Sequence, residues 1–206
     1  MKACILVMGV PASGKSTVAR ALSERLGIPV FSKDDMKETL YDTIGFRSRA
    51  EKVALGNAAM ELLYDTARRM MARGLPLILE NNFENASRPG LEALLRGSGY
   101  TPIAVRLTGE WDAIYERFVE RDRSGLRHPG HVVNDCYPVR PGSGQPETQL
   151  SRTEFERSIH ARGMDTFDVG GPTLCVDTTQ WTQVDIDAIA AWVKARMEAG
   201  AQDAET

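Results

Sequence analysis

The sequence has few cysteines and histidines, no long apolar run and no strong excess of one charge. Three cysteines and three histidines occur in 206 residues, with no CxxC pair, so neither a disulfide framework nor a full zinc ligand set is present. No apolar run approaches the ~18–20 residues that cross a bilayer, and the run at 3–8 is too short for a signal peptide. We therefore expect a protein of the reducing cytoplasm that does not enter membranes.

The charge balance is close to neutral but unevenly distributed. The chain has 25 Lys and Arg against 28 Asp and Glu, a net charge of −3, which argues against a nucleic-acid-coating surface. Residues 117–162 contain eight arginines, no lysine and six acidic residues. The planar guanidinium fork suits bidentate phosphate binding, so this segment is a candidate local anion site. Nucleic acid is not the partner that this composition favours.

Short apolar runs alternate with helical patterns along the chain, which predicts an α/β fold with a parallel sheet. The length suits one domain, residues 1–206, with a polar tail at 199–206 that we expect to fray. The predicted strands are 28–32, 75–79, 102–107, 174–176 and the N-terminal run, and the predicted helices are 15–26, 34–41, 47–73, 89–95, 110–121, 151–161 and 184–197. The cap of the helix over 34–41 is either Lys33 or Asp34, and Ser151 with Glu154 predicts a capping box at the start of the helix over 151–161.

The segment 124–149 is rich in Gly, Pro and Arg and is predicted to be a long loop. At 26 residues it is longer than compact domains usually tolerate, and such loops are often lids or binding segments. We expect an enlarged lid insertion over about 121–163. Its histidines, His128 and His131, fit a hinge or a substrate contact better than a metal site, because no full ligand set accompanies them.

A phosphate-binding motif lies at residues 9–16, where Gly-Val-Pro-Ala-Ser-Gly-Lys-Ser matches G-x-x-x-x-G-K-[ST] in full. Glycines let backbone N–H groups surround a polyphosphate, and the helix that follows adds its positive end. Lys15 would contact the β- and γ-phosphates and Ser16 would bind Mg²⁺. The motif predicts ATP and Mg²⁺ as cofactors, with nucleotide-binding residues Gly9, Pro11, Ala12, Ser13, Gly14, Lys15, Ser16 and Thr17.

Residues 9–17, followed by Phe-Ser-Lys-Asp-Asp-Met-Lys at 31–37, resemble the P-loop small kinases. These include polynucleotide 5′-hydroxyl kinases and gluconate- and shikimate-type kinases. The resemblance is closest over 5–42 and looser elsewhere. It implies an adenylate-kinase-like P-loop NTPase fold with a five-stranded parallel sheet in the order 2-3-1-4-5. It also implies an ATP-dependent phosphotransferase that acts on a hydroxyl group of a small molecule.

An acidic residue follows the second strand, where these kinases orient or deprotonate the acceptor hydroxyl. Asp34 matches that position, and a carboxylate beside the P-loop strand would lie within hydrogen-bond reach of a hydroxyl near the γ-phosphate. The alternative is that Asp34 only caps the next helix while Asp35 lies in solvent. Lys37 matches a basic residue that binds substrate phosphate in the polynucleotide kinases, or it simply lies in water.

The third strand ends near Glu80, where small kinases often have an Asp that holds a Mg²⁺-bound water or the substrate. The resemblance makes Ser16 and Glu80 the candidate metal ligands, although glutamate departs from the family pattern. Asn81 and Phe83 would then face the acceptor pocket, with Asn81 a substrate ligand. The alternative is that this segment is only a turn before a helix.

Two arginines lie one helical turn apart just before the predicted lid. The resemblance makes Arg121 the lid arginine that neutralises charge during phosphoryl transfer. The candidate catalytic residues are therefore Lys15, Asp34 and Arg121.

Arg117 would lie at the adenine side, near the turn 177–179. Arg123 and Arg127 are further candidates, Arg127 as a substrate ligand. The alternative is a solvated helix face on which the arginines pair with acidic neighbours: Glu116, Glu120 and Asp122.

Two other functions remain open. A polynucleotide 5′-hydroxyl kinase needs a basic channel, which the net charge of −3 and the lone Lys37 disfavour. A nucleotide-dependent ATPase or switch would need no acceptor. No second apolar run ends in Asp as a Walker B strand does, so the strand that ends at Glu80 is the only candidate for that role.

Overall fold

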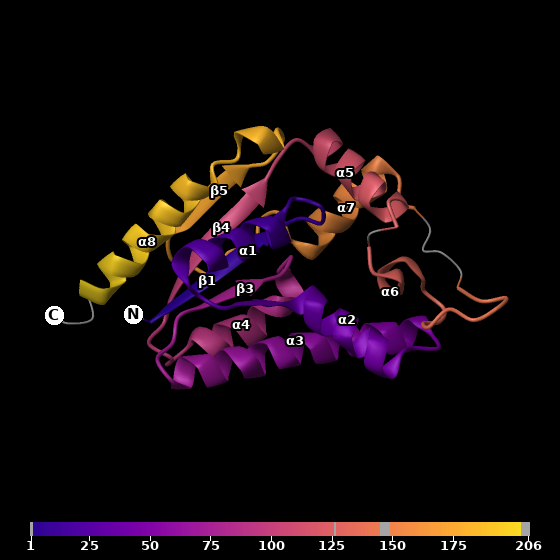
Figure 1. Ribbon diagram of the computed structural model, residues 1–206, viewed down its shortest axis with the longest axis horizontal. Helices are drawn as coiled ribbons and strands as arrows, with labels where there is room; N and C mark the ends of the chain where they lie inside the picture. The colour runs from indigo at the N-terminus through magenta and orange to yellow at the C-terminus, as the bar shows by residue number, and fades with distance from the viewer. Residues whose placement is uncertain (1, 126, 145–148, 203–206) are drawn as a thin grey trace.

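A computed structural model describes residues 2–125, 127–144 and 149–202, and its centre is a five-stranded sheet (Figure 1). All strand pairings are parallel, as the alternation of strands and helices predicts, and the order is β2-β3-β1-β4-β5, as the resemblance to the small kinases implies. The strands are β1 (Ala3–Gly9), β2 (Val30–Ser32), β3 (Leu77–Glu80), β4 (Thr101–Thr108) and β5 (Thr173–Asp177).

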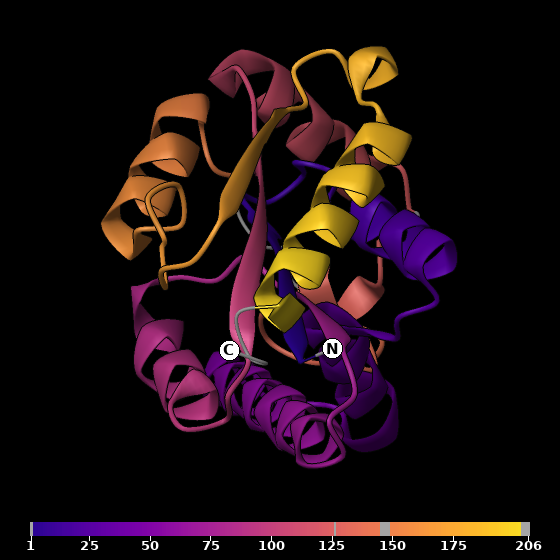
Figure 2. The same ribbon diagram turned by 90° about the vertical axis from the view of Figure 1, so that its left-hand side faces the viewer.

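Helices cover both faces of this sheet (Figures 1 and 2). The α-helices are α1 (Lys15–Leu26), α2 (Lys33–Ile44), α3 (Arg49–Ala72), α4 (Arg88–Leu95), α5 (Trp111–Arg123), α6 (Pro129–Val132), α7 (Arg152–Arg162) and α8 (Ile186–Gln202). Two short 3₁₀ helices, η1 (Asn85–Ser87) and η2 (Trp181–Gln183), precede α4 and α8. Within the described ranges, no helix combines the length and the apolar character needed to cross a bilayer.

The central strand β1 is buried on both faces. Ile5 and Val7 belong to the core shared with α1 and α8, whereas Cys4 and Leu6 belong to the core shared with α3 and α4. Alternate residues of a strand point to opposite faces, so a strand covered on both sides has an uninterrupted apolar sequence. That is why β1 was recognisable from its sequence alone.

Strand register brings polar residues together at the carboxyl edge of the sheet. Glu80 pairs with Val7 of β1 on one side and with Ser32 of β2 on the other. The P-loop follows β1 and Asp34 follows β2, so both lie at the same edge. In open parallel sheets, ligands bind at this edge.

Several predicted boundaries need correction. Helix α2 begins at Lys33 and is capped by Ser32, whose hydroxyl accepts from the Asp35 N–H at 3.4 Å, so neither Lys33 nor Asp34 is the cap. Strand β2 begins at Val30 rather than at residue 28, because Pro29 lacks the N–H that a ladder requires. Helix α8 continues to Gln202, so residues 199–202 of the expected frayed tail are helical. The rest of that tail lies outside the described residues.

Part of the predicted loop is docked on the body of the protein. Residues 127–138, hereafter the docked segment, contain α6 and pair with Phe46 through an antiparallel bridge at Tyr137. Val133 packs with Tyr41 and Phe46 in a separate apolar cluster beneath it. The buried Lys52 ammonium donates to the carbonyls of His131 and Val133 at 3.1 and 2.7 Å. The docked segment is therefore structured rather than a loop throughout, because Phe46, between α2 and α3, and Lys52 of α3 hydrogen-bond to its backbone.

Helix α7 packs against α5 and against the P-loop. Ile114 of α5 joins Phe155, Ile159 and Met164 in an apolar cluster that also includes Val10 of the P-loop. The predicted capping box at its start is confirmed: Ser151 accepts from the Glu154 N–H, and the Glu154 side chain accepts from the Ser151 N–H.

Candidate functional site

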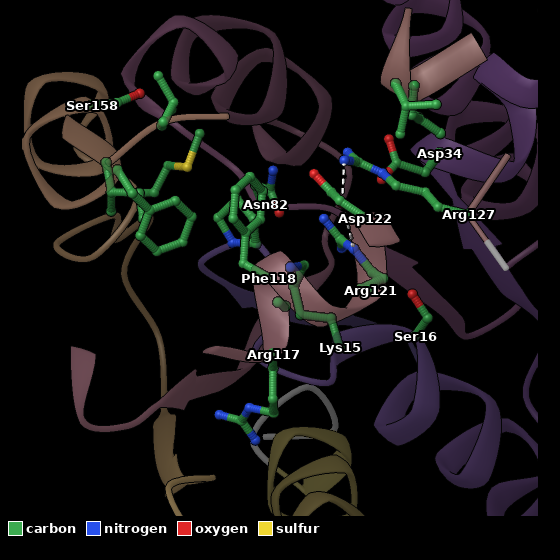
Figure 3. Close-up of a pocket in the computed structure, with 18 of the residues that line it drawn as sticks. Lys15, Ser16, Asp34, Asn82, Arg117, Phe118, Arg121, Asp122, Arg127 and Ser158 are labelled. Atoms are coloured by element: carbon green, nitrogen blue, oxygen red, sulfur yellow. Dashed lines mark hydrogen bonds and ion pairs between the residues drawn. The ribbon is translucent and has the colours of Figure 1, made fainter. Parts of the chain in front are cut away.

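A cavity of about 860 Å³ opens at the carboxyl edge of the sheet (Figure 3). The P-loop forms its floor, α2 and the docked segment form one wall, and α5 with α7 forms another. The structure brings most of the predicted site residues to its lining: Pro11, Ala12, Gly14, Lys15, Ser16, Thr17, Asp34, Lys37, Glu80, Arg117, Arg121 and Arg127.

Gly9 and Ser13 shape the P-loop without lining the cavity. A Cβ on Gly9 would lie 2.5 Å from the Leu107 carbonyl oxygen, so only glycine fits beside β4. Ala12 and Gly14 have φ values of 64° and 91°, which turns the chain back on itself. Ser13 is fully buried, and its hydroxyl has no hydrogen-bond partner among the described residues. The loop therefore has the curled shape that presents backbone N–H groups to a phosphate.

Lys15 lies inside this loop. Its Nζ donates to the Val10 carbonyl at 2.8 Å, and the residue is only 8% exposed. Burial lowers the pKa of Lys15, and the charge of Arg121 acts in the same direction, whereas Glu80 and Asp34 oppose the shift. A phosphate oxygen would offer this ammonium a charged acceptor in place of a neutral carbonyl, and charge-assisted bonds are the stronger kind.

Asp34 is exposed to the cavity in the first turn of α2. Burial raises the pKa of Asp34, but the nearby basic groups, with His131 and Lys37 the largest, outweigh that effect, and the net shift is downward. The carboxylate is therefore ionised at neutral pH. Asp35 does not line the cavity, and its carboxylate lies 3.7 Å from Arg20 on the outer side of the helix.

Glu80 and Ser16 provide oxygen atoms at the cavity floor. The Glu80 carboxylate is 4% exposed and accepts a 2.6 Å hydrogen bond from the Ser32 hydroxyl. Burial raises its pKa, while the Lys15 charge and the Ser32 bond partly offset that shift. Within the described ranges, no cluster of three His, Cys, Asp or Glu side chains could hold a metal. Two oxygen donors fit Mg²⁺ that is held mostly by substrate phosphates and water.

The lid arginines have different surroundings. Arg121 lies with its guanidinium carbon 5.5 Å from the Phe118 ring centroid. Its buried Nε and Nη2 have no hydrogen-bond acceptor in the described structure, since the nearest carboxylate oxygen, on Asp122, is 3.5 Å from Nε. Burial, with the charge of Arg127, lowers the pKa of Arg121. Arg117 points away and donates to the Thr178 carbonyl at 2.7 Å, at the turn after β5 (Figure 3).

The structure does not bring Asn81 or Phe83 to the cavity. The Asn81 amide is buried and donates to the Met60 sulfur at 3.5 Å. Phe83 is fully buried and stacks on Phe167 with ring centroids 5.7 Å apart. Asn82 lines the cavity in their place, because successive side chains point in opposite directions as the chain leaves β3.

His131 is a functional candidate for which the sequence indicates no partner side chain. The docked segment places this buried residue in the cavity wall. Its Nε2 lies 3.0 Å from the Glu38 carboxylate. Burial lowers the pKa of His131 although Glu38 and Asp34 oppose the shift, so the ring is neutral at neutral pH. The contact joins residues 93 positions apart, and no local sequence signal could have revealed it.

Comparison with known proteins found several similarities. Residues 4–136 match a family model described as an AAA domain. A search of curated proteins found no match. The crystal structure of a "putative kinase" from Chloroflexus aurantiacus is 30% identical, has a TM-score of 0.75 and covers 97% of both chains.

Two more distant structures share the fold. A gluconokinase from Sinorhizobium meliloti is 17% identical with a TM-score of 0.54, covering 99% of this chain and 96% of its own. The APS kinase of Mycobacterium tuberculosis, in complex with AMPPNP and APS, is 18% identical with a TM-score of 0.52, covering 96% and 98%. With its complete P-loop and the 2-3-1-4-5 sheet, the chain belongs to the AAA domain family and has the P-loop fold of the small kinases.

Proposed function

We propose that this protein is an ATP-dependent kinase that transfers the γ-phosphoryl group to a hydroxyl group of a small-molecule acceptor. The observation that carries this proposal is one cavity lined by a P-loop lysine, an ionised carboxylate and a half-buried arginine: Lys15, Asp34 and Arg121. Solved structures of the same fold include a gluconokinase and an APS kinase bound to an ATP analogue. Its three cysteines are free thiols, which suits the cytoplasmic setting that we propose.

On the nucleotide side, the P-loop N–H groups would hold the triphosphate, and Lys15 would exchange the Val10 carbonyl for phosphate oxygens. Arg121 would direct its unpaired N–H donors at the γ-phosphate. Ser16 and Glu80 would hold Mg²⁺, which neutralises charge on the phosphates. Arg117 would position the turn at Thr178, which we propose lies at the adenine side.

On the acceptor side, Asp34 would accept a hydrogen bond from the acceptor hydroxyl and take its proton. A carboxylate with a lowered pKa is a weak base. Phosphoryl transfer passes through a loose transition state in which positioning matters more than early deprotonation. The main contribution of Asp34 is therefore to orient the hydroxyl oxygen toward the γ-phosphorus.

The test compares Lys15→Ala, Asp34→Asn and the neighbouring control Asp35→Asn. We expect Asp34→Asn to lose roughly 10²–10⁴-fold in kcat while it still binds ATP. Lys15→Ala should weaken ATP binding as well as transfer. Asp35→Asn should behave like the wild type, because Asp35 does not line the cavity. Initial rates with a panel of hydroxyl compounds and calorimetry with AMPPNP would measure both properties.

Two outcomes would contradict this mechanism. One is full activity in Asp34→Asn, and the other is an equal loss in Asp35→Asn. ATP hydrolysis that no acceptor accelerates would instead favour a nucleotide-dependent switch. Preferential phosphorylation of 5′-hydroxyl oligonucleotides, with affinity that falls steeply with salt, would favour a polynucleotide kinase.

A further inference from the structure

The imidazole of His131 contacts α2 one helical turn beyond Asp34. Its Nε2 lies 3.0 Å from Glu38 Oε1. Glu38 follows Asp34 by four residues, so the two carboxylates share one face of the helix. Asp34 and His131 both line the cavity, and each shifts the pKa of the other. The ring and the carboxylate that we propose to orient the acceptor are therefore electrostatically coupled.

Several contacts hold the His131 ring in place. Lys52 donates to the backbone carbonyl of His131 at 3.1 Å, and the Tyr41 ring meets the imidazole edge-on with centroids 5.7 Å apart. The preceding Gly130 packs so closely on Tyr41 that a Cβ would come 2.4 Å from that ring. Together with the Glu38 contact, this packing fixes the direction of the ring nitrogens before any substrate binds.

The Glu38 contact also determines which nitrogen of His131 is free. A carboxylate accepts hydrogen bonds, so Nε2 carries the hydrogen of the neutral ring and Nδ1 carries the lone pair. Nδ1 has no hydrogen-bond partner among the described residues, yet it is not one of the unpartnered atoms sealed from solvent. The described lining of the cavity has nine Lys or Arg against three Asp or Glu, which favours the neutral ring. His131 therefore offers the cavity an unprotonated nitrogen.

Asp34 by itself holds a proton poorly. The nearby basic groups lower its pKa, so a proton that it takes from an acceptor hydroxyl is easily given up. In a loose phosphoryl-transfer transition state, the hydroxyl still carries its proton when the phosphoryl group has largely left ATP. A proton must then move on at the end of the step. Asp34 and Glu38 both favour the protonated form of His131.

We propose that His131 is the final acceptor of the proton released by the acceptor hydroxyl, and that this proton reaches Nδ1 from Asp34, directly or through one water molecule. The inference rests on the proposed kinase function. In this step the acceptor O–H bond breaks, as does the bond between the γ-phosphorus and the bridging oxygen, and a new O–P bond forms. ADP leaves with the electrons of the broken P–O bond, and the imidazole becomes an imidazolium. Glu38 is the residue that positions the ring.

The first test measures the coupling between His131 and Asp34 without turnover. The imidazoles of the three histidines are titrated by NMR in protein saturated with Mg²⁺ and AMPPNP, and the His131 signal is assigned by its loss in His131→Gln. Asp34 and Glu38 both raise the pKa of His131, so Asp34→Asn and Glu38→Gln should each lower it. Asp35→Asn, on the outer side of the helix, should leave it unchanged.

A His131 pKa that is the same in Asp34→Asn and in the wild type would overturn the inference, whatever the activity. The titration must be interpreted with every group that faces the ring. The charged and titratable groups around His131 are Asp34, Lys37, Glu38 and Tyr41 of α2, Lys52 of α3, and Arg127 and His128 of the docked segment.

The second test compares two matched variants of the docked segment. His131→Gln can still donate to Glu38 through its amide but has no basic nitrogen. We expect it to lose roughly 10²-fold in kcat with the KM for ATP unchanged. The rate is measured with the best acceptor of the hydroxyl panel, and also as ATP hydrolysis, in which water takes the place of the acceptor.

The control is His128→Asn. This change removes the 3.0 Å contact between His128 and Asp42, but asparagine can still accept from the Gly130 N–H at the start of α6. His128 does not line the cavity, so kcat should match the wild type. An equal loss in both variants would show that only docking of the segment matters, and would overturn the inference.

A pH profile separates proton acceptance from a structural role. A group that must be unprotonated gives kcat an acidic limb. The limb contributed by His131 should be absent in His131→Gln and should move to lower pH in Glu38→Gln, which leaves the imidazole in place. A limb that remains in His131→Gln belongs to another group, such as Glu80.

Failure of this inference and failure of the kinase proposal give different results. Wild-type kcat and an unaltered acidic limb in His131→Gln would overturn the role of His131 and leave the kinase proposal standing. Absence of transfer to any hydroxyl compound by the wild-type protein would contradict the kinase proposal itself.

Discussion

At the residue scale, one hydroxyl joins the start of α2 to the floor of the cavity. The Ser32 Oγ donates to Glu80 at 2.6 Å and accepts from the Asp35 N–H at 3.4 Å. The same atom thus caps the helix that carries Asp34 and lowers the pKa of a buried carboxyl group. The position of the proposed base and the ionisation of the proposed metal ligand are coupled through this serine.

Ser32→Ala should therefore change both stability and pH dependence. Loss of the cap should cost about 0.5–2 kcal/mol in the free energy of unfolding. Because the Ser32 bond lowers the pKa of Glu80, its removal should raise that pKa further. If ionised Glu80 is needed, the acidic limb of the kcat profile should then move to higher pH. Urea unfolding and pH–rate profiles would measure the two effects.

Ser48→Ala is a matched control for this prediction. Ser48 caps α3 by accepting from the Glu51 N–H at 3.2 Å, so its loss should cost a similar free energy of unfolding. Ser48 does not line the cavity, and the pH profile should stay unchanged. An acidic limb that is identical in Ser32→Ala and in the wild type would show that Ser32 does not control Glu80.

At the element scale, one buried cation joins the docked segment to α3. Lys52 is 7% exposed and donates to the carbonyls of His131 and Val133 from the first turn of that helix. Lys52→Met should leave these carbonyls without a donor and cost about 1–3 kcal/mol. Limited proteolysis within residues 127–138 should become faster.

The control for this prediction is Lys194→Met, which removes an exposed lysine from α8. It should leave both the unfolding free energy and the cleavage pattern unchanged. If Lys52→Met were cleaved at the wild-type rate, the apolar cluster of Tyr41, Phe46 and Val133 would be sufficient to hold the segment.

The elements that could be predicted from the sequence are those whose pattern lies within a few neighbouring residues. Strand β1, the P-loop and the capping box at Ser151 each lie within a few consecutive residues, and the structure confirms all three. The docked segment could not be predicted, because its contacts join Lys52 to Val133, 81 positions away. The orientation of Asn81 also depended on where β3 ends, and a boundary error of one residue reverses the side of every following side chain.

At the scale of the whole molecule, the charge is strongly polarised. The cavity is cationic while the chain as a whole carries −3, so the surface outside the cavity is acidic. A charged cleft with low-dielectric walls focuses its field and speeds the approach of oppositely charged ligands. Nucleotide would thus be attracted to the cavity and repelled elsewhere.

The association rate of AMPPNP should therefore fall as salt rises, since the Debye length shortens from about 30 Å at 0.01 M to about 10 Å at 0.1 M. Stopped-flow binding would measure this dependence. Arg127→Gln should flatten it, whereas Arg96→Gln, an exposed change outside the cavity, should not. A rate independent of salt in the wild type would contradict electrostatic steering.

The indole of Trp181 rests on the P-loop itself. A Cβ on Gly14 would lie 2.3 Å from this ring, so the ring covers the bare α-carbon at the start of α1. Trp181 is also 38% exposed, which leaves its emission sensitive to solvent and to nearby charge. The chain thus contains an intrinsic optical reporter of its own phosphate loop, and nucleotide binding could be followed by fluorescence without any attached dye.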